Sequence, residues 1–404
     1  MQPVSITVGP SGADIVGQDN RALQAAVDYV ARLGGGTVRI APGTYLMWDS
    51  LHLRSHVAVV GSGRDTILRK ADAVSSALYL DGDYGEEQVT VCDASGFEPG
   101  MGITVSDERS SGFHVTVATI IARDGNTLAI SAPLLSDYMV ANGACAQTTF
   151  PVLSGYYLEG ALVESLMVNG NCDGNPPLNG CRGAGIFLYR ANACQIRNCL
   201  VYHYNGDGIS FQQSSDTIVE GCECAWNAAL GLHPGSGSQR PQVRQCWSHD
   251  NGRIGLFLCW RVRHGRFENN RLEHNGESGI SIGHKDTDNL FVSNTVANNG
   301  RYGIHFREES EPMAGHRNTF VDCQVLDNGT ADDGAGVRID GITHDITFRN
   351  CLIGNTRRDA GQQRYGISIG KQATNIVLEN VRFQDNLLAD IHDEREPEAA
   401  IAHD

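Results

Sequence analysis

Glycine recurs in this chain at a fixed spacing. Gly231, Gly255, Gly279 and Gly303 each follow the last by 24 residues. A repeat of this size is typical of a solenoid, in which each repeat packs against its neighbours. The wider pattern is anchored at Gly185, Gly208, Gly231, Gly255, Gly279, Gly303, Gly336 and Gly366. The longer steps before the last two glycines predict loops around SEPMAGHRN and RRDAGQQRY.

Each repeat contains short β-type segments. A strand of the GI-x-F type is followed by a polar turn and a second strand such as CQIRNCLV or LFVSNTVAN. Asparagine, glycine and β-branched residues dominate these segments, and helical periodicity is absent from them. The repeat therefore predicts an all-β fold, a parallel β-helix.

Four segments are expected along the chain. Residues 1–80 are expected to hold a capping helix and the first coils, because Asp19 or Asn20 can cap an amphipathic run that ends at Gly34-Gly35-Gly36. Residues 81–146 break the repeat and alternate like antiparallel hairpins, which predicts a β-rich insertion. Residues 147–395 are expected to form the main β-helix with its groove, and residues 396–404 a tail.

One column of small residues is expected inside the coils. It contains Cys199, Cys222, Cys246, Asn270, Asn294, Cys323 and Cys351, one per coil. Buried cysteine behaves as a small hydrophobe, and stacked asparagines can hydrogen-bond along the axis. The sequences Asn251-Gly252, Asn275-Gly276 and Asn299-Gly300 are predicted to supply left-handed residues at corners and nothing more.

Composition limits the partners. The net charge of −16 argues against nucleic acid. No stretch approaches the roughly 20 apolar residues of a membrane span, and no leader is visible, which fits a cytoplasmic or a mature secreted protein. No cofactor or metal is expected, with calcium left open because the turns are rich in Asp and Asn. A homotrimer is an open possibility for a solenoid of this kind.

An outward strip holds the candidate site residues. Positions two and four after each anchor glycine, and those just beyond, are predicted to point outward because side chains alternate along a strand. The strip is rich in aromatic, histidine, arginine and acidic residues, as a saccharide groove is. Candidate catalytic residues are His233, His284, Lys285, Tyr302, His305, Arg307 and Glu308. Candidate substrate-binding residues are Tyr189, Arg190, Gln212, Trp260, Arg261 and Asp286. An ordinary ion-paired surface is the alternative.

Three functions fit this strip, with a poly- or oligosaccharide as partner. Proton abstraction beside a uronate carboxylate needs a base and cations, which leads to β-elimination or epimerisation and would use Tyr302, His305, Arg307 and Lys285. Glycoside hydrolysis or fructan-type transfer needs two carboxylates, such as Glu308 or Glu309 with Asp286 or Asp207. A non-catalytic glycan-binding or spike-like protein is the third reading.

Several stretches resemble a known family. GGGTVRIAPGTY, MVNGNCDGN and SHDNGRIGLFLCWRVRHGRFENN followed by VSNTVANNGRYGI resemble the catalytic module of bacterial mannuronan C5-epimerases, the alginate epimerases, within the pectate-lyase-like superfamily. The resemblance covers most of the chain except the insertion and the last residues. It implies a right-handed parallel β-helix and a lyase- or epimerase-like enzyme.

The family's catalytic motif is not kept. Its pattern Tyr-Gly-Phe-Asp-Pro-His corresponds to Leu230-Gly231-Leu232-His233-Pro234-Gly235 here, and a family arginine and lysine fall on Glu277 and Asp340. The resemblance therefore implies the fold without the family's site. Tyr302, His305 and Arg307 occupy the same three strand offsets three coils later, so we expect the chemistry there.

Overall fold

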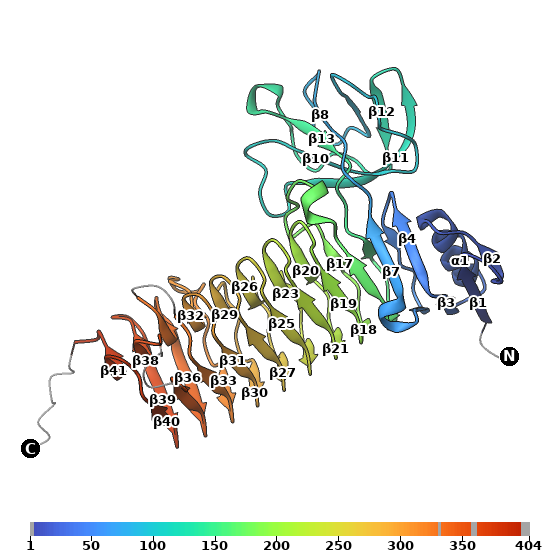
Figure 1. Ribbon diagram of the computed structural model, residues 1–404. Helices are drawn as coiled ribbons and strands as arrows, with labels where there is room; N and C mark the ends of the chain where they lie inside the picture. The colour runs from blue at the N-terminus through green and yellow to red at the C-terminus, as the bar shows by residue number, and fades with distance from the viewer. Residues whose placement is uncertain (1–3, 330–332, 357–361, 397–404) are drawn as a thin grey trace, which may run out of the picture. The chain divides into compact units, whose positions relative to one another are not determined.

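The protein is a parallel β-helix, as the glycine repeat predicts (Figure 1). The computed structural model describes residues 4–329, 333–356 and 362–396. The chain divides into two compact units, Met1–His233 and Pro234–Asp404, which are described in turn. In both, successive coils add one strand to each of three parallel sheets. Within the described ranges no helix has the length and apolar character needed to cross a membrane.

An amphipathic helix covers the first strands, as expected. Helix α1 (Asn20–Arg32) begins at Asp19, whose carboxylate accepts the backbone N–H groups of Arg21 and Ala22. The helix packs on β1 (Val4–Gly9) and β3 (Gly36–Ile40) with an apolar side made of Leu23, Ala26, Val27 and Val30. It therefore protects the start of the coils from pairing with another strand edge.

The first unit contains three parallel sheets. The first consists of β2 (Ile15–Val16), β1, β3, β6 (Val57–Val60), β15 (Leu162–Glu164), β18 (Gln195–Arg197) and β21 (Ile218–Glu220). The second consists of β4 (Gly43–Met47), β7 (Thr66–Lys70), β16 (Met167–Asn169), β19 (Leu200–Tyr202) and β22 (Glu223–Ala225). The third consists of β5 (Leu51–His52), β14 (Leu153–Tyr156), β17 (Ala184–Tyr189) and β20 (Asp207–Gln212), and the next strand, β23 (Leu230–Gly235), holds the division between the units. Three short 3-10 helices are Gly63–Asp65, Val140–Asn142 and Cys172–Gly174.

A separate antiparallel sheet leaves the coils of the first unit after β7 and returns at β14 (Figure 1). Its strands are β8 (Ser75–Ala77), β13 (Cys145–Gln147), β10 (Gly102–Ser106), β11 (Thr116–Asp124), β12 (Thr127–Ile130) and β9 (Gln88–Thr90), in that order. The sheet has its own hydrophobic core, with Phe97, Ile120 and Tyr138 fully buried. We call residues 75–147 the inserted sheet.

A lysine is buried where the inserted sheet rejoins the coils. The Lys70 side chain is fully buried, its ammonium donates to the carbonyl of Thr148 and to the side-chain oxygen of Asn175, and it lies 4.4 Å from the Phe150 ring centroid. Burial lowers the pKa of Lys70 from 10.5 to about 7.

This burial predicts a pH-dependent stability. Between pH values of about 7 and 10.5 the unfolded chain binds a proton at Lys70 that the folded chain lacks, so the free energy of unfolding rises with pH, by about 1.4 kcal/mol per unit. When the free energy of unfolding is measured with denaturant at several pH values in this range, it is expected to rise less steeply with pH for Lys70→Met than for the wild type. Lys371→Met, an exposed lysine, is the matched control. Equal slopes in all three proteins would contradict a depressed pKa at Lys70.

The second unit repeats the same three-sheet coil. Its first sheet consists of β24 (Gln242–Arg244), β27 (Arg266–Glu268), β30 (Leu290–Val292), β33 (Thr319–Val321), β36 (His344–Arg349) and β39 (Thr374–Glu379). The second consists of β25 (Trp247–His249), β28 (Arg271–Glu273), β31 (Thr295–Ala297), β34 (Gln324–Leu326), β37 (Leu352–Gly354) and β40 (Arg382–Gln384). The third consists of β26 (Ile254–Phe257), β29 (Ser278–Ile282), β32 (Tyr302–Phe306), β35 (Ala335–Ile339), β38 (Tyr365–Ile369) and β41 (Ala389–Asp393).

Stacks of like residues fill the interior. The rings of Phe291 and Phe320 stack with centroids 4.4 Å apart, and Phe267 and Phe348 extend the stack at either end. The predicted cysteine and asparagine column is buried in every coil. Within it, Asn270 donates its side-chain N–H to the side-chain oxygen of Asn294 at 2.9 Å. These ladders satisfy polar groups that would otherwise be costly inside.

The prediction for the Asn-Gly corners is wrong. Asn251, Asn275 and Asn299 are buried, and each donates its side-chain N–H to the next asparagine along the axis. The left-handed residues are those just before, at Asp250, His274 and Asn298. A buried amide with partners in both directions is more valuable inside the coil than in a solvated corner.

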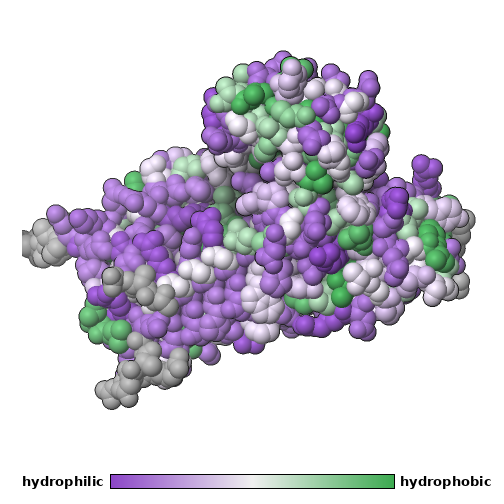
Figure 2. Space-filling view, turned by 45° about the horizontal axis from the view of Figure 1, so that its top comes forward, coloured by the Kyte–Doolittle hydropathy of each residue, from purple (hydrophilic) through white to green (hydrophobic). Residues whose placement is uncertain are grey.

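The surface between these elements is mostly polar. Figure 2 shows one face, on which hydrophilic residues predominate and hydrophobic ones form small separate patches. Isolated apolar residues of this kind are normal on a protein surface. The face therefore offers mainly hydrogen-bonding groups to a ligand.

Candidate functional site

The third sheet of the second unit aligns polar side chains in columns. Strand pairing places one residue from each coil in register, namely Phe257, Ser281, His305, Arg338, Ser368 and His392. Adjacent strands lie about 4.8 Å apart, so groups on neighbouring coils can act on one sugar. Arg307 and Asp340 each follow a column residue by two positions, just past the ends of β32 and β35.

His305 is held by a carboxylate. Its Nε2 lies 3.3 Å from Oδ2 of Asp340, and Arg338 Nε donates to the other oxygen of Asp340 at 2.7 Å. Burial opposes ionisation of Asp340, but the hydrogen bonds from His305 and Arg338 together lower its pKa. Because an ionised carboxylate only accepts, the proton of His305 lies on Nε2. Its Nδ1, which has no protein partner among the described residues, is left as a basic nitrogen on a partly exposed ring.

Tyr302 supports this histidine from the start of β32. Its ring centroid lies 4.7 Å from that of His305, and its hydroxyl donates to Asp333 Oδ2 at 3.0 Å. Burial raises the pKa of Tyr302 to about 12. The side chain is 5% exposed, so Tyr302 is a neutral phenol that positions His305.

Arg307 is fixed beneath the surface. Its Nη1 donates to Ser281 Oγ at 2.8 Å, its Nη2 donates to the Leu258 carbonyl at 2.9 Å, and its guanidinium lies 4.5 Å from the Phe257 ring centroid. Asp286 Oδ2 lies 3.4 Å from the same Nη2. Arg307 therefore has little freedom to follow a substrate, but its charge acts on its neighbours.

Asp286 is not on the surface where the sequence pattern placed it. Its side chain is fully buried and accepts the backbone N–H groups of Val262 and Gly283. Burial raises the pKa of Asp286 to about 7, against the opposing charge of Arg307. Contact with a sugar is excluded by this burial, and the carboxylate instead anchors Arg307.

His284 and Glu309 form a second pair. His284 Nε2 lies 2.7 Å from Glu309 Oε1, and its Nδ1 faces donors on Arg307 and Cys259. Burial and the charge of Arg307 lower the pKa of His284 to about 4, so the ring is neutral at neutral pH. Burial raises the pKa of Glu309. The pair therefore presents a carboxyl group that is easier to protonate than an exposed glutamate.

Four further predicted residues of this unit are accessible. Trp260 is 46% exposed, with its ring centroid 5.2 Å from that of His284, so its face can stack on a sugar. Lys285 is partly exposed, and its ammonium has no partner in the described part of the chain. Glu308 and Arg261 are exposed, and no side-chain partner of either lies in the ranges that the structure describes.

The predicted residues of the first unit are placed differently. His233 is 3% exposed and Gln212 is fully buried, with their side-chain nitrogens 3.4 Å apart, and His233 Nδ1 lies 2.7 Å from Asp207 Oδ2. The loop of residues 170–183 covers them. Gly180 in this loop accepts a hydrogen bond from Ser210 Oγ at its carbonyl, and it lies so close to the strand that a Cβ on it would overlap the Asp207 carboxylate. Their outward orientation does not make them accessible.

Tyr189 and Arg190 remain at the surface of that unit. Tyr189 is partly exposed and Arg190 exposed. The Arg190 guanidinium lies 5.6 Å from the ring centroids of both Tyr189 and Tyr157, and its Nε donates to Gln213. This aromatic and cationic cluster belongs to the first unit, whereas the Tyr302–His305 and His284–Lys285 residues belong to the second.

Sequence reasoning named Asp340 and Glu309 but did not pair them with the histidines of the candidate site. Asp340 and Glu309 contact the two histidines. The available signal for Asp340 was its position two residues after Arg338 in the outward column. The 33-residue step between Gly303 and Gly336 obscured it, because the lengthened coil conceals how close His305 and Asp340 lie in space.

Comparison with known proteins agrees with this architecture. A family model described as the right handed beta helix region matches residues 184–353. The chain is thus a right-handed parallel β-helix protein. A comparison with curated protein sequences finds no match.

Solved structures share the fold at low identity. The A-module of Azotobacter vinelandii mannuronan C-5 epimerase AlgE6 is 13% identical, with a TM-score of 0.56 over 94% of this chain and 95% of that one. A glycoside hydrolase is 13% identical, with a TM-score of 0.54 over 93% and 96%. The Dettilon tailspike protein is 12% identical, with a TM-score of 0.58 over 96% and 68%. The expected similarity in fold to the epimerases is confirmed, and at these identities it concerns the fold alone.

Proposed function

We propose that the protein is a polysaccharide-active enzyme that removes the proton beside a uronate carboxylate. The observation that carries this proposal is the His305–Asp340 pair, which leaves Nδ1 of His305 without a protein partner among the described residues. A histidine with this arrangement is suited to general-base catalysis.

The neighbouring groups supply what the reaction needs. His305 would take the proton from C5, and the negative charge that develops on the sugar carboxylate would be stabilised by a cation such as Lys285. In an elimination, the C4–O bond then breaks and the imidazolium returns its proton to the departing oxygen. In an epimerisation, C5 instead receives a proton from water on its other face, and His305 gives the abstracted proton to solvent. Trp260 offers an aromatic surface for a sugar ring.

The structural neighbours support a carbohydrate substrate. They include a mannuronan C-5 epimerase module and a glycoside hydrolase. Both have little sequence similarity to this chain, so they support only the class of ligand. The roles of individual residues are inferred from the geometry of the site.

A glycoside hydrolase or transglycosidase is the second candidate. The observation that favours it is the contrast between two carboxyl groups. Burial raises the pKa of Glu309. Burial also acts on Asp340, but its hydrogen bonds from His305 and Arg338 outweigh that effect and lower its pKa. Carboxyl groups with such opposed environments are the usual acid and base of a glycosidase.

One experiment separates the candidates. The protein is incubated in heavy water with a panel of uronate polysaccharides, including polymannuronate and polygalacturonate, and three products are measured. Deuterium at C5 is expected for an epimerisation, and ultraviolet absorbance of unsaturated ends without deuterium at C5 is expected for an elimination; either signal supports proton abstraction. New reducing ends with neither signal would indicate the hydrolase and overturn the proposal. Binding without any product would indicate a glycan-binding protein.

A further inference from the structure

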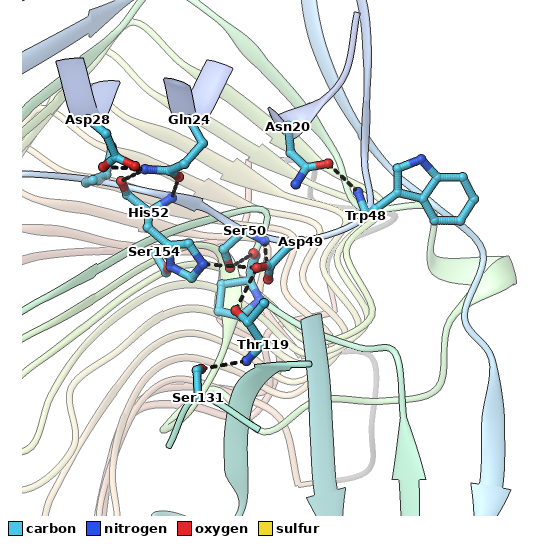
Figure 3. A network of polar contacts seen from close by, with 12 residues as sticks. Asn20, Gln24, Asp28, Trp48, Asp49, Ser50, His52, Thr119, Ser131 and Ser154 are labelled. Carbon is cyan, nitrogen blue, oxygen red and sulfur yellow. Dashed lines mark hydrogen bonds and ion pairs between the residues drawn. The ribbon is translucent and has the colours of Figure 1, made fainter. Parts of the chain in front are cut away.

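A pocket lies in the first unit, between its coils and the inserted sheet. The pocket has a volume of about 440 Å³, and Asp49, His52 and Ser154 line it (Figure 3). None of these three residues belongs to the site proposed above. Their side chains come from two segments far apart in the chain: Asp49 precedes β5 and His52 ends it, whereas Ser154 lies on β14.

The three side chains form a continuous hydrogen-bonded chain. Ser154 Oγ lies 3.0 Å from His52 Nδ1, and His52 Nε2 lies 3.1 Å from Asp49 Oδ2. Since Asp49 as a carboxylate only accepts, Nε2 carries the histidine proton and Nδ1 accepts from the serine hydroxyl. This is the order of groups in a serine nucleophile, its base and the acid that orients the base, which is recognised by geometry and not by sequence position.

Other residues fix the acid of this chain. Asp49 is 6% exposed and accepts the backbone N–H of Ser50 at 2.7 Å and the hydroxyl of Thr119, from the inserted sheet, at 2.7 Å. Three donors therefore point at its two oxygens. The Asp49 side chain is therefore held in one orientation toward His52.

The base is fixed by helix α1. Gln24 accepts the backbone N–H of His52 at 2.8 Å and donates to the His52 carbonyl at 3.1 Å. The amide of Gln24 is itself tied to Asp28 at 3.0 Å (Figure 3). A base held on both sides of its backbone meets the requirement that a catalytic group be positioned before the substrate arrives.

The walls of the pocket suit a small acyl group and a sugar. The inserted sheet and its connections contribute apolar side chains, among them Ala132, Pro133 and Leu135. The coils contribute Tyr156 and Tyr157, the latter 69% exposed, as flat surfaces for a pyranose ring.

Two groups on the coil side can stabilise negative charge. The Arg182 guanidinium is fixed by two hydrogen bonds to the Phe113 carbonyl, at 3.0 and 2.6 Å. Burial lowers the pKa of Arg182, although arginine remains charged in proteins. The Tyr156 hydroxyl has no hydrogen-bond partner in the described part of the chain and lines the same pocket. Both are donors of the kind that an acyl-transfer oxyanion requires.

We propose that Ser154, His52 and Asp49 form a serine esterase site that removes small acyl groups, such as acetyl, from hydroxyl groups of a saccharide. The Ser154 oxygen attacks the ester carbonyl while His52 Nδ1 takes its proton. The carbon–oxygen bond to the sugar breaks, and the sugar oxygen leaves with that proton. Water then attacks the acyl-serine, gives a proton to His52 and releases the carboxylic acid as the serine recovers its hydrogen. Asp49 is a positioning residue that stabilises the imidazolium.

The site is narrow on the nucleophile's side. Ser154 is 1% exposed although it lines the pocket, so little open space surrounds it. Such a site favours a compact acyl group over a branched or long one. The activity is independent of the uronate chemistry proposed above, because its residues lie in the other unit of the chain.

The test uses the full chain and two probes. An alkyl fluorophosphonate should label one serine, identified as Ser154 by peptide mass spectrometry, and p-nitrophenyl acetate and peracetylated glucose should release acetate. Ser154→Ala is expected to lose labelling and at least about 100-fold of the hydrolysis. The control is Ser131→Ala. Ser131 lines the same pocket, where its hydroxyl accepts the Thr119 backbone N–H, and this variant should keep both the labelling of Ser154 and the hydrolysis.

Asp49→Asn distinguishes positioning from a structural role. Loss of the negative charge beside His52 should change the pH profile of the hydrolysis, which a merely structural defect would not do. Thermal unfolding of each variant reports whether it remains folded. Absence of labelling and hydrolysis in the wild type, or the same labelling in folded Ser154→Ala, would overturn the proposal.

Discussion

Replacing His305 by alanine is expected to lower the activity on a uronate polysaccharide by at least about 100-fold, the contribution of a positioned general base. The physical reason is specific. Asp340 holds Nε2 of His305 and leaves its Nδ1 without a protein partner among the described residues. The measurement is the initial rate of deuterium entry at C5 for an epimerisation, or of absorbance from unsaturated ends for an elimination, compared with the wild type at one pH.

A matched histidine provides the control for this loss. His392 lies in the same outward column three coils further on, is partly exposed and stacks on Tyr365. His392→Ala should keep nearly full activity. If His305→Ala did so too while remaining folded, the base would have to lie elsewhere and the proposed function would lose its main support.

Replacing Asn275 by leucine is expected to destabilise the fold by about 3 kcal/mol or more, because several buried hydrogen bonds are lost at once. Asn275 accepts from the Asn251 side chain at 2.9 Å and donates to Asn299 at 3.0 Å and to the Ser248 carbonyl at 3.2 Å. Leucine has a similar volume but none of these groups, so each partner loses an interior contact.

The free energy of unfolding in denaturant measures this cost. Thr295→Leu, at a partly exposed position of the neighbouring strand β31, introduces the same side chain without breaking the ladder. Its free energy of unfolding should lie within about 0.5 kcal/mol of the wild type. A similar small change for Asn275→Leu would mean that the asparagine ladder contributes little.

The periodic spacing of residues predicts most of the fold but only part of the candidate site. The glycine spacing predicts the coils, the Asp19 cap predicts the helix, and one residue per coil predicts the buried cysteine and asparagine column. Orientation follows from alternation along a strand, but accessibility depends on what lies above the strand. His233 and Gln212 are covered by a loop, at residues 170–183, that has no counterpart in the repeat.

The residues that sequence reasoning missed lie where the repeat is irregular. Ser154 is in register with Phe187, and so belongs to the same outward column, but Val152 stands where Gly185 anchors the next coil. Without the anchor glycine this coil is not visible in the pattern. His52 and Ser154 are neighbours on paired strands, although the inserted sheet separates them by 102 residues in the chain. Only the closed coil brings the two together.

The internal ladders have a consequence for how such a chain can change. Asparagine amides and phenylalanine rings meet their equivalents in the next coil, so each coil presents almost the same interior to its neighbour. Selection on stability and selection on chemistry then act on different residues of the same strand, since the inward side chains are constrained by the ladder and the outward ones are not. A new catalytic group can arise on any coil at little cost to folding, and this decoupling accounts for one scaffold recurring in chains about 13% identical with differently named activities.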